Sequence, residues 1–426
     1  MVDALLTVFW GLVVLIFLVV VHELGHFVAA KGFGVRVTEF MIGMPGPNIG
    51  FEYKGTRYGV TAIPLGGYNR IAGLEGGEED PNLGPVLAYV YHHGSTDVEH
   101  VAAGCGISED DAAFALTVLD GWGSINKPGR SNKTGRYCAP AAGGYDLGQP
   151  REVDDPAALL DRERACTFRA LSYPKRLVTL LAGPFMNIAL AVLLFLVCFC
   201  GIGIAYSTTG VGGLVEGGPA QQAGLQVGDV ITNINGQEVG SISAINAALS
   251  GVREGDVVTV GYTRAGQQLQ ASIAVTVNEE GRPIIGFYGA VERYHMGPVQ
   301  ALQTSWSMLT TTVGAYASLF NPATAAQTLS QSSSVVGISV LAKKAAGESL
   351  FMFLYIMGVV SLSLGVVNLV PIPPLDGGKI VTETVERIAR RPVPVRLINA
   401  TTIAAMGLFL VLFAMLVVQD FNNFIL

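Results

Sequence analysis

Four long runs without charged residues constrain this 426-residue chain more than any other feature of its sequence. A helix needs about 20 residues to cross the roughly 30 Å hydrocarbon core of a bilayer. Four runs reach or approach that length: Ala4 to Val21, Leu177 to Ala205, Ser349 to Leu375 and Leu397 to Gln419. Half of all residues are hydrophobic and only 14% are charged, which is unusual for a soluble enzyme. The sequence therefore predicts a polytopic α-helical membrane protein with four transmembrane helices.

Basic residues flank these runs unevenly. They precede the second run and separate the third from the fourth: Arg169, Lys175 and Arg176, then Lys379, Arg387, Arg390, Arg391 and Arg396. Because cytoplasmic flanks of membrane helices are enriched in Lys and Arg, we expect both segments in the cytoplasm and both chain termini outside it. The first run has no basic segment before it and no clean cleavage site after it, which favours a retained helix over a secretory signal.

The segments between the runs differ in composition. Residues 34–74 have the pattern of short strands and predict a β region beside the membrane's inner face. The predicted order is a first transmembrane helix (1–33), this membrane-associated β region (34–74), a cytoplasmic insert (75–165), a second transmembrane helix (170–206), an extracytoplasmic α+β domain (207–292), an interfacial helical segment (293–348), a third transmembrane helix (349–378), a basic cytoplasmic loop or helix (379–396) and a fourth transmembrane helix with its tail (397–426).

The insert holds most of the negative charge. From Glu75 to Arg164 it has 16 acidic and 7 basic residues. Its apolar residues at helical spacing resemble a small helix-turn-helix or winged-helix unit, but an acidic surface argues against nucleic acid, which attracts Lys and Arg. We therefore expect a regulatory module that contacts a cytoplasmic protein. A zinc site formed by His92, His93, His100 and Cys105 is an alternative, although their spacing fits no standard pattern.

Residues 207–292 contain the stretch GGPAQQAGLQVGDVITNINGQEV, which resembles PDZ domains. Such domains add a peptide strand to a sheet edge and hold a terminal carboxylate in backbone amides. In the permuted bacterial arrangement the carboxylate loop falls at Ile285, Gly286 and Phe287. The alternative is a plain β spacer, because Gly-rich loops are common.

The first run ends in His22, Glu23 and His26, an HExxH pattern. Positions i and i+4 lie on one helix face, so both imidazoles can bind one metal while the adjacent carboxylate reaches a metal-bound water as general base. Ionisable groups at membrane depth are costly unless they pair or coordinate, which makes them functional candidates. The alternative is that these side chains only cap the end of a span.

Zinc needs a third protein ligand and an open position for water. Asp376, in NLVPIPPLDGG, is an acid at the edge of a predicted span. Three prolines there prevent a regular helix, and broken backbone beside a carboxylate is typical of a polar cavity. Otherwise Asp376 only caps the following helix.

These motifs together resemble the site-two protease family of intramembrane zinc metalloproteases, of the bacterial M50 type with a single PDZ-like domain. The resemblance rests on HELGH, on NLVPIPPLDGG, on GPFMN at Gly183 to Asn187, on PLGGY at Pro64 to Tyr68, on the PDZ-like domain and on the closing DFNNF. It excludes the insert. One departure is Ser332-Ser333-Ser334-Val335, where related bacterial proteins often have Leu-Ser-Gly-Pro.

The resemblance implies one Zn²⁺ per chain, bound by His22, His26 and Asp376. It implies that Glu23 is the base and that Asn187 and Asn368 orient the substrate or stabilise the oxyanion. The expected substrates are transmembrane segments of proteins already cut outside the membrane, such as anti-sigma factors or remnant signal peptides. The expected location is the bacterial cytoplasmic (inner) membrane, with the active site toward the cytoplasm.

Two other functions remain open from the residues alone. A zinc transporter could use the same ligands without hydrolysis, although transport needs no base such as Glu23 beside a water. A catalytically silent membrane adaptor bearing a PDZ-like domain could keep the motifs as relics, although an intact ligand set argues against that.

Overall fold

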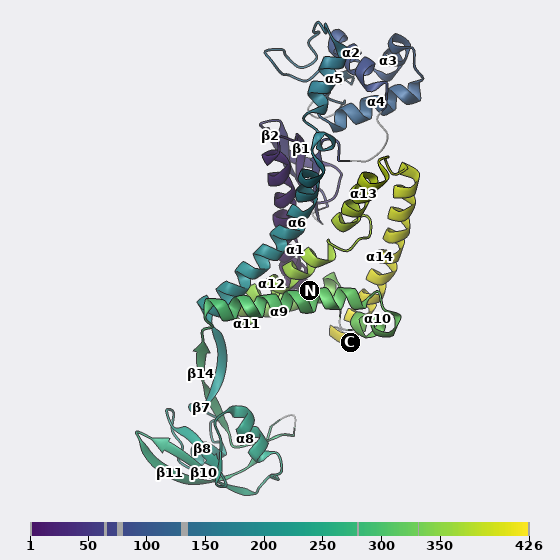
Figure 1. Cartoon of the computed structure of the whole chain (residues 1–426). Coiled ribbons are helices and arrows are strands. Elements are labelled where there is room, and N and C mark those ends of the chain that lie inside the picture. The colour runs from purple at the N-terminus through teal and green to yellow at the C-terminus, as the bar shows by residue number, and fades with distance from the viewer. Residues whose placement is uncertain are drawn as a thin grey trace. The chain divides into compact units, whose positions relative to one another are not determined.

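The computed structural model describes residues 2–63, 66–74, 80–128, 135–278, 281–330 and 332–424. Pro64 and Leu65 of the PLGGY motif and parts of the acidic insert lie outside the described residues. The chain divides into two compact units, one formed by residues 1–195 with 303–426 and the other by residues 196–302. Figure 1 shows the elements of both units.

Four helices in the described part of the chain are long and apolar enough to cross a membrane. They are α1 (Val2–Gly32), α6 (Tyr173–Leu196) continued by the π-helical turn η2 (Val197–Ile202), α12 (Leu350–Val367) and α14 (Val395–Phe424). The third apolar run therefore stays helical only to Val367, before its prolines begin.

Small residues let these helices approach one another closely. A Cβ on Gly25 of α1 would lie 2.3 Å from the Ala182 carbonyl oxygen of α6, and one on Gly358 of α12 would lie 2.7 Å from the Phe195 ring. Glycine at such crossings allows backbone packing where lipid supplies no hydrophobic driving force between helices.

A four-stranded sheet follows α1. Its strands are β1 (Val37–Ile42), β2 (Asn48–Tyr53), β3 (Thr56–Thr61) and β4 (Gly67–Ile71), in the order β2-β3-β1-β4. β1 runs parallel to β3, and the other two pairings are antiparallel. β4 is an edge strand of this sheet, and it packs against α1.

The insert has a hydrophobic core of its own. Its elements are α2 (Leu83–His93), β5 (Ser95–Thr96), α3 (Val98–Cys105), α4 (Glu109–Gly121), β6 (Tyr137–Cys138) and α5 (Pro156–Arg164). Ser108 caps α4 by accepting a hydrogen bond from the Asp111 N–H, and Asp97 caps α3 in the same way. A short 3₁₀ turn, η1 (Phe168–Ala170), leads into α6.

In its described residues the second unit contains a six-stranded sheet, a separate two-stranded sheet and two short helices. Its elements are β7 (Ile204–Leu214), α7 (Pro219–Gln222), β8 (Val230–Ile234), β9 (Gln237–Glu238), α8 (Ile242–Leu249), β10 (Val257–Arg264), β11 (Gln267–Ala274), β12 (Thr276–Val277), β13 (Pro283–Ile284) and β14 (Phe287–Tyr294). The sheet order is β11-β10-β8-β7-β14, with β9 paired to β8, so β14 is an edge strand. Arg264 binds both carboxylate oxygens of buried Asp229, at 2.7 and 2.8 Å, and lowers the pKa of that carboxyl.

Four more helices complete the chain: α9 (Pro298–Ser318), α10 (Pro322–Ser330), α11 (Val335–Glu348) and α13 (Asp376–Ala389). Ser334, within the Ser-Ser-Ser-Val departure, caps α11 by accepting from the Val336 N–H. Buried Asp420 of α14 accepts hydrogen bonds from the Ser334 and Gly337 N–H groups, at 2.6 and 3.1 Å. A carboxylate stabilises a helix N-terminus, so Asp420 ties α14 to α11.

Candidate metal centre

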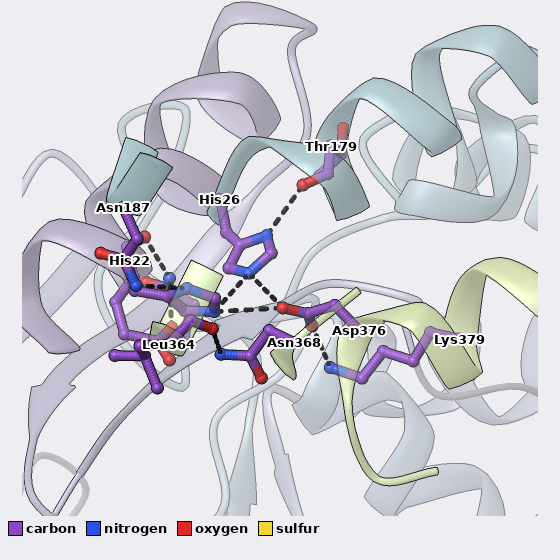
Figure 2. A network of polar contacts seen from close by, with 10 residues as sticks. His22, His26, Thr179, Asn187, Leu364, Asn368, Asp376 and Lys379 are labelled. Atoms are coloured by element: carbon purple, nitrogen blue, oxygen red, sulfur yellow. Dashed lines mark hydrogen bonds and ion pairs between the residues drawn. The ribbon is translucent and has the colours of Figure 1, made fainter. Parts of the chain in front are cut away.

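Three buried side chains from two distant parts of the chain converge in the first unit. His22 and His26 lie one turn apart on α1, and Asp376 is the first residue of α13. Their relative exposures are 8%, 7% and 5%. Figure 2 shows both imidazoles pointing at the same carboxylate oxygen.

The distances among these atoms are nearly equal. Asp376 Oδ2 lies 3.1 Å from each Nε2 atom, and the two Nε2 atoms are 3.2 Å apart. Ligand atoms of a tetrahedral zinc site, each about 2.0–2.2 Å from the ion, are about 3.3–3.6 Å apart. The three atoms are therefore close to the spacing of three corners of such a tetrahedron, which leaves the fourth corner for water.

The protonation of His26 also fits a metal. Its Nδ1 lies 2.8 Å from the Thr179 carbonyl oxygen, which can only accept, so Nδ1 carries the proton and donates it. A neutral ring then has a bare lone pair on Nε2, and this lone pair faces an oxygen of Asp376 that is also an acceptor. Two acceptors at this distance repel unless a proton or a metal ion lies between them. A carbonyl that accepts from the remote ring nitrogen is a common support for metal-binding histidine.

The local backbone explains why α6 can reach this site. A Cβ on Gly183 would lie 2.2 Å from His26 Nε2, so only glycine leaves room for the ring there. Asn187, one turn later, is fully buried and its Nδ2 lies 3.3 Å from His22 Nδ1. Asn187 Oδ1 is buried without a partner in the described structure.

The turn before α13 places Asp376. The Gly377 N–H donates to the Asn368 carbonyl oxygen at 2.7 Å, which closes the proline-rich loop between α12 and α13. A Cβ on Gly377 would lie 2.4 Å from two backbone oxygens, and one on Gly378 would lie 2.4 Å from the Pro373 nitrogen. The LDGG sequence is therefore a packing requirement, because no side chain fits at either glycine. Lys379 pairs with Asp376 Oδ1 at 3.2 Å.

Glu23 and Asn368 contact other groups. The Glu23 carboxylate accepts a hydrogen bond from Asn69 Nδ2 of β4 at 2.7 Å. Asn368 ends α12, and its amide donates to the Leu364 carbonyl oxygen at 2.9 Å (Figure 2). Asn368 therefore lies beside the centre and bonds its own helix.

A profile of peptidase family M50 matches residues 10–414 of this chain. The chain belongs to peptidase family M50. It is 30% identical to "Zinc metalloprotease RasP" of Oceanobacillus iheyensis, over 88% of this chain and 89% of that protein. It is 29% identical to "Zinc metalloprotease RasP" of Shouchella clausii, over 94% of each chain. Among solved structures, a PDZ domain of the SdrC-like protein Lin2157 from Listeria innocua is 31% identical over 21% of this chain and 99% of that one, with a TM-score of 0.19.

The second unit of this M50 peptidase contains a groove at its sheet edge. The groove has a volume of about 350 Å³ and lies between α8 and β14. Ile285, Gly286 and Phe287, predicted as a carboxylate loop, line it together with Ile245 and Leu249 of α8. Gly286 has a φ of +83°, a left-handed conformation that favours glycine.

The described residues of the insert contain no group of metal-binding side chains. Among the residues that the structure describes, only His22, His26 and Asp376 form a group of three or more metal-binding side chains. His92, His93, His100 and Cys105 are all described, and they do not form such a group. His100 instead pairs with Asp97 at 2.6 Å.

Sequence reasoning missed three contributors to the centre: the Thr179 carbonyl, Lys379 and Asn69. A backbone carbonyl has no sequence signal at all. Lys379 could have been noticed from its i,i+3 spacing to Asp376. Asn69 has no local sequence signal either, because its partner Glu23 lies 46 positions earlier in the chain.

Proposed function

We propose that this M50 peptidase hydrolyses peptide bonds of membrane-protein segments at one zinc ion held by His22, His26 and Asp376, with Glu23 as general base. The family match over residues 10–414 and the relatives named zinc metalloprotease support the activity. The single observation that carries the residue assignment is the convergence of two imidazole nitrogens and one carboxylate oxygen within 3.2 Å of each other.

The three side chains suit zinc by type as well as by position. Imidazole nitrogen and carboxylate oxygen are both ordinary zinc ligands, and three protein ligands are usual for catalytic sites. Zinc bound there supplies an acidified water and a positive charge that polarises a carbonyl. The family and the relatives imply zinc as the metal.

Side chains and one backbone carbonyl of this chain transfer the proton and hold the two histidine rings in place. Glu23, adjacent to His22, accepts the proton of the attacking water and returns it to the leaving amine. Thr179 holds the His26 ring with Nε2 free for the metal. Asn187 holds the His22 ring, because its buried Oδ1 gains a partner if the amide turns to accept from Nδ1–H. A role of Asn187 and Asn368 toward the substrate or oxyanion stays a prediction.

The substrate must present bare backbone, because a helix hides its carbonyls in its own hydrogen bonds. The free edge of β4 can pair with an unwound segment, since β4 packs against α1, the helix that carries Glu23. On β2, Ile49 and Phe51 are 83% and 68% exposed, which supports contact of this sheet with the bilayer.

The remaining parts serve substrate selection and control. The α8–β14 groove of the second unit takes a peptide end left by an earlier cut, with Ile285, Gly286 and Phe287 at the carboxylate. The insert contacts a cytoplasmic protein. The basic residues before α6 and between α13 and α14 support a cytoplasmic position of the insert and of the 379–396 segment, with both termini outside and the metal centre toward the cytoplasmic side.

The test is cleavage of a single-span substrate by the detergent-purified full chain. Wild type should cut it, whereas Glu23→Gln and chelator-treated wild type should not. Glu348→Gln, at an exposed glutamate paired with Lys344 at 3.9 Å, is the matched control and should behave as wild type. Cleavage that persists in Glu23→Gln would exclude Glu23 as the base.

A further inference from the structure

Asn69 of β4 contacts Glu23 twice through one amide nitrogen, once at the carboxylate and once at the backbone carbonyl. Its Nδ2 donates to the Glu23 carboxylate oxygen Oε2 at 2.7 Å and to the Glu23 carbonyl oxygen at 2.6 Å. Both partners are acceptors, so only the NH₂ end of the amide can satisfy them together. The Asn69 amide therefore connects the backbone carbonyl of Glu23 to the carboxylate of the same residue.

The position of Asn69 follows from strand alternation. Alternate residues of a strand point to opposite faces, so Gly67, Asn69 and Ile71 share one face of β4. A Cβ on Gly67 would lie 3.0 Å from the Val19 side chain and 3.4 Å from that of Glu23. Ile71 packs in the cluster that contains Ala30. This face of β4 therefore lies along α1, and its one polar side chain is at Glu23.

Side chains on the other face of β4 bind β1 and the insert. Tyr68 donates to Glu39 Oε2 at 2.8 Å, and Arg70 pairs with Glu39 and with Asp120 of the insert, both at 3.5 Å. Burial and the nearby Glu39 carboxylate raise the pKa of Tyr68 to about 12, so its hydroxyl stays protonated and continues to donate. These contacts fix β4 from the side opposite Asn69.

We propose that Asn69 is a positioning residue for the reaction, which aims the Glu23 carboxylate by holding both its oxygen and its backbone carbonyl. This inference rests on the proposed role of Glu23 as general base. A half-buried glutamate side chain has three rotatable bonds, and an acid or base must sit within hydrogen-bond reach of its proton to act. Asn69 restricts those bonds through its 2.7 Å contact with the carboxylate, while its 2.6 Å contact with the Glu23 carbonyl oxygen anchors the amide itself.

The main variant is Asn69→Leu, which keeps the size of the side chain and removes both hydrogen bonds. We expect kcat for a single-span substrate to fall by about 10- to 100-fold, because small misplacements of a catalytic group cost that much. KM should stay within about twofold and zinc content unchanged, since neither the ligands nor the strand backbone is altered. Asn69→Asp should lower kcat further, because its carboxylate would face the two acceptor oxygens of Glu23.

Two further variants make the result specific. Asn69→Ala removes the amide without adding bulk and should reproduce the kcat loss if Asn69→Leu does not fold. Thr38→Val is the matched control, because the Thr38 hydroxyl donates to the Arg70 carbonyl oxygen at 3.2 Å and does not touch Glu23. It should keep kcat within about twofold of wild type.

Glu23→Gln in the same assay separates the two proposals. If Glu23→Gln is inactive while Asn69→Leu and Asn69→Ala keep wild-type kcat, the positioning role is wrong and the base assignment stands. If activity and zinc content fall in parallel in the Asn69 variants, Asn69 supports the metal centre and not the base. If Glu23→Gln stays active, the proposed base and the positioning role are both overturned.

Discussion

Gly183 occupies a point where any side chain would collide with the metal centre. A Cβ there would lie 2.2 Å from His26 Nε2, so Gly183→Ala must move the ring or shift α6 against α1. Overpacking of this kind costs about 1–3 kcal/mol. We expect Gly183→Ala to lose zinc and proteolytic activity together, as measured by metal analysis and substrate cleavage.

The control for this substitution is Gly407→Ala in α14. A Cβ at Gly407 meets no heavy atom within 4 Å, and alanine favours a helix over glycine by about 1 kcal/mol. This variant should keep both zinc and activity. Full zinc content in Gly183→Ala would show that His26 is not held where the structure places it.

The residues of the centre differ in how far the sequence could predict them. The spacing of His22 and His26 on one helix face predicts that both bind one metal ion, without any knowledge of the tertiary structure. Asp376 is more than 300 positions away, so its partnership could be inferred only from its type, its span-end position and the family resemblance. The Thr179 carbonyl and the Asn69 amide act through tertiary contacts that no local pattern encodes.

The helix α13 carries Asp376 at its start and a buried ion network along its length. Arg176 lies 2.6 Å from Glu383, and Arg169 lies 3.4 Å from Glu383 and 2.6 Å from Glu386. Tyr173 adds a hydroxyl contact of 3.0 Å to Thr384. These bonds dock α13 on the start of α6, and they therefore fix the position of Asp376, the proposed third ligand.

Breaking this network should weaken zinc binding, although none of its residues is a proposed ligand. Glu383→Gln removes the charge partner of Arg176, whose side chain is 19% exposed, so the cost stays below the about 3–5 kcal/mol of a fully buried pair. We expect a lower thermal midpoint and faster zinc release to a chelator. Glu348→Gln, in an exposed pair, should change neither. Unaltered zinc release in Glu383→Gln would mean that α13 docking does not control the ligand.

Element boundaries show where sequence patterns stop being informative. The apolar run from Ser349 to Leu375 contains both a helix and a proline-rich loop, and hydropathy alone cannot separate them. Prolines mark the loop because each lacks an N–H and clashes with the preceding helical turn. The hydrogen bonds between Asp420 and the start of α11 join residues 83 to 86 positions apart, which local patterns do not predict.

The two ends of the insert lie next to each other, because the residues that flank it are joined by backbone hydrogen bonds. The Phe168 N–H donates to the Ala72 carbonyl oxygen at 2.7 Å, and the Arg36 N–H donates to the Cys166 carbonyl oxygen at 2.8 Å. Phe168 is fully buried in a cluster that includes Val35 and Ile71. The residues that flank the insert therefore belong to the body that carries the metal centre.

Deletion of residues 75–165, replaced by a short Gly-Ser linker, should leave that body intact. We expect the deletion protein to bind zinc and to hydrolyse a minimal single-span substrate, because no ligand and no contact to Glu23 is removed. Arg36 loses its partners Glu163, at 2.8 Å, and the Trp122 carbonyl, at 3.0 Å, but the deletion also exposes its guanidinium to water, so the lost pair should cost little. A folded, zinc-loaded deletion protein without activity would show that the insert is part of the catalytic machinery.

The arrangement of the whole chain was predictable in outline. Four apolar runs predict four spanning helices because the bilayer sets their length, and four helices within the described residues meet that requirement. The contacts of the insert with the sheet, such as Arg70 with Asp120, could not be predicted, because charged surface residues offer many alternative partners. The family resemblance does not cover the insert either.

The central claim is that His22, His26 and Asp376 hold one zinc ion. The most direct test is X-ray absorption spectroscopy with metal analysis on zinc-loaded wild type and Asp376→Ala. The account predicts one zinc per wild-type chain, with only nitrogen and oxygen ligands at about 2.0–2.2 Å, and loss of zinc from Asp376→Ala. A sulfur ligand in wild type, or unchanged zinc in Asp376→Ala, would contradict it.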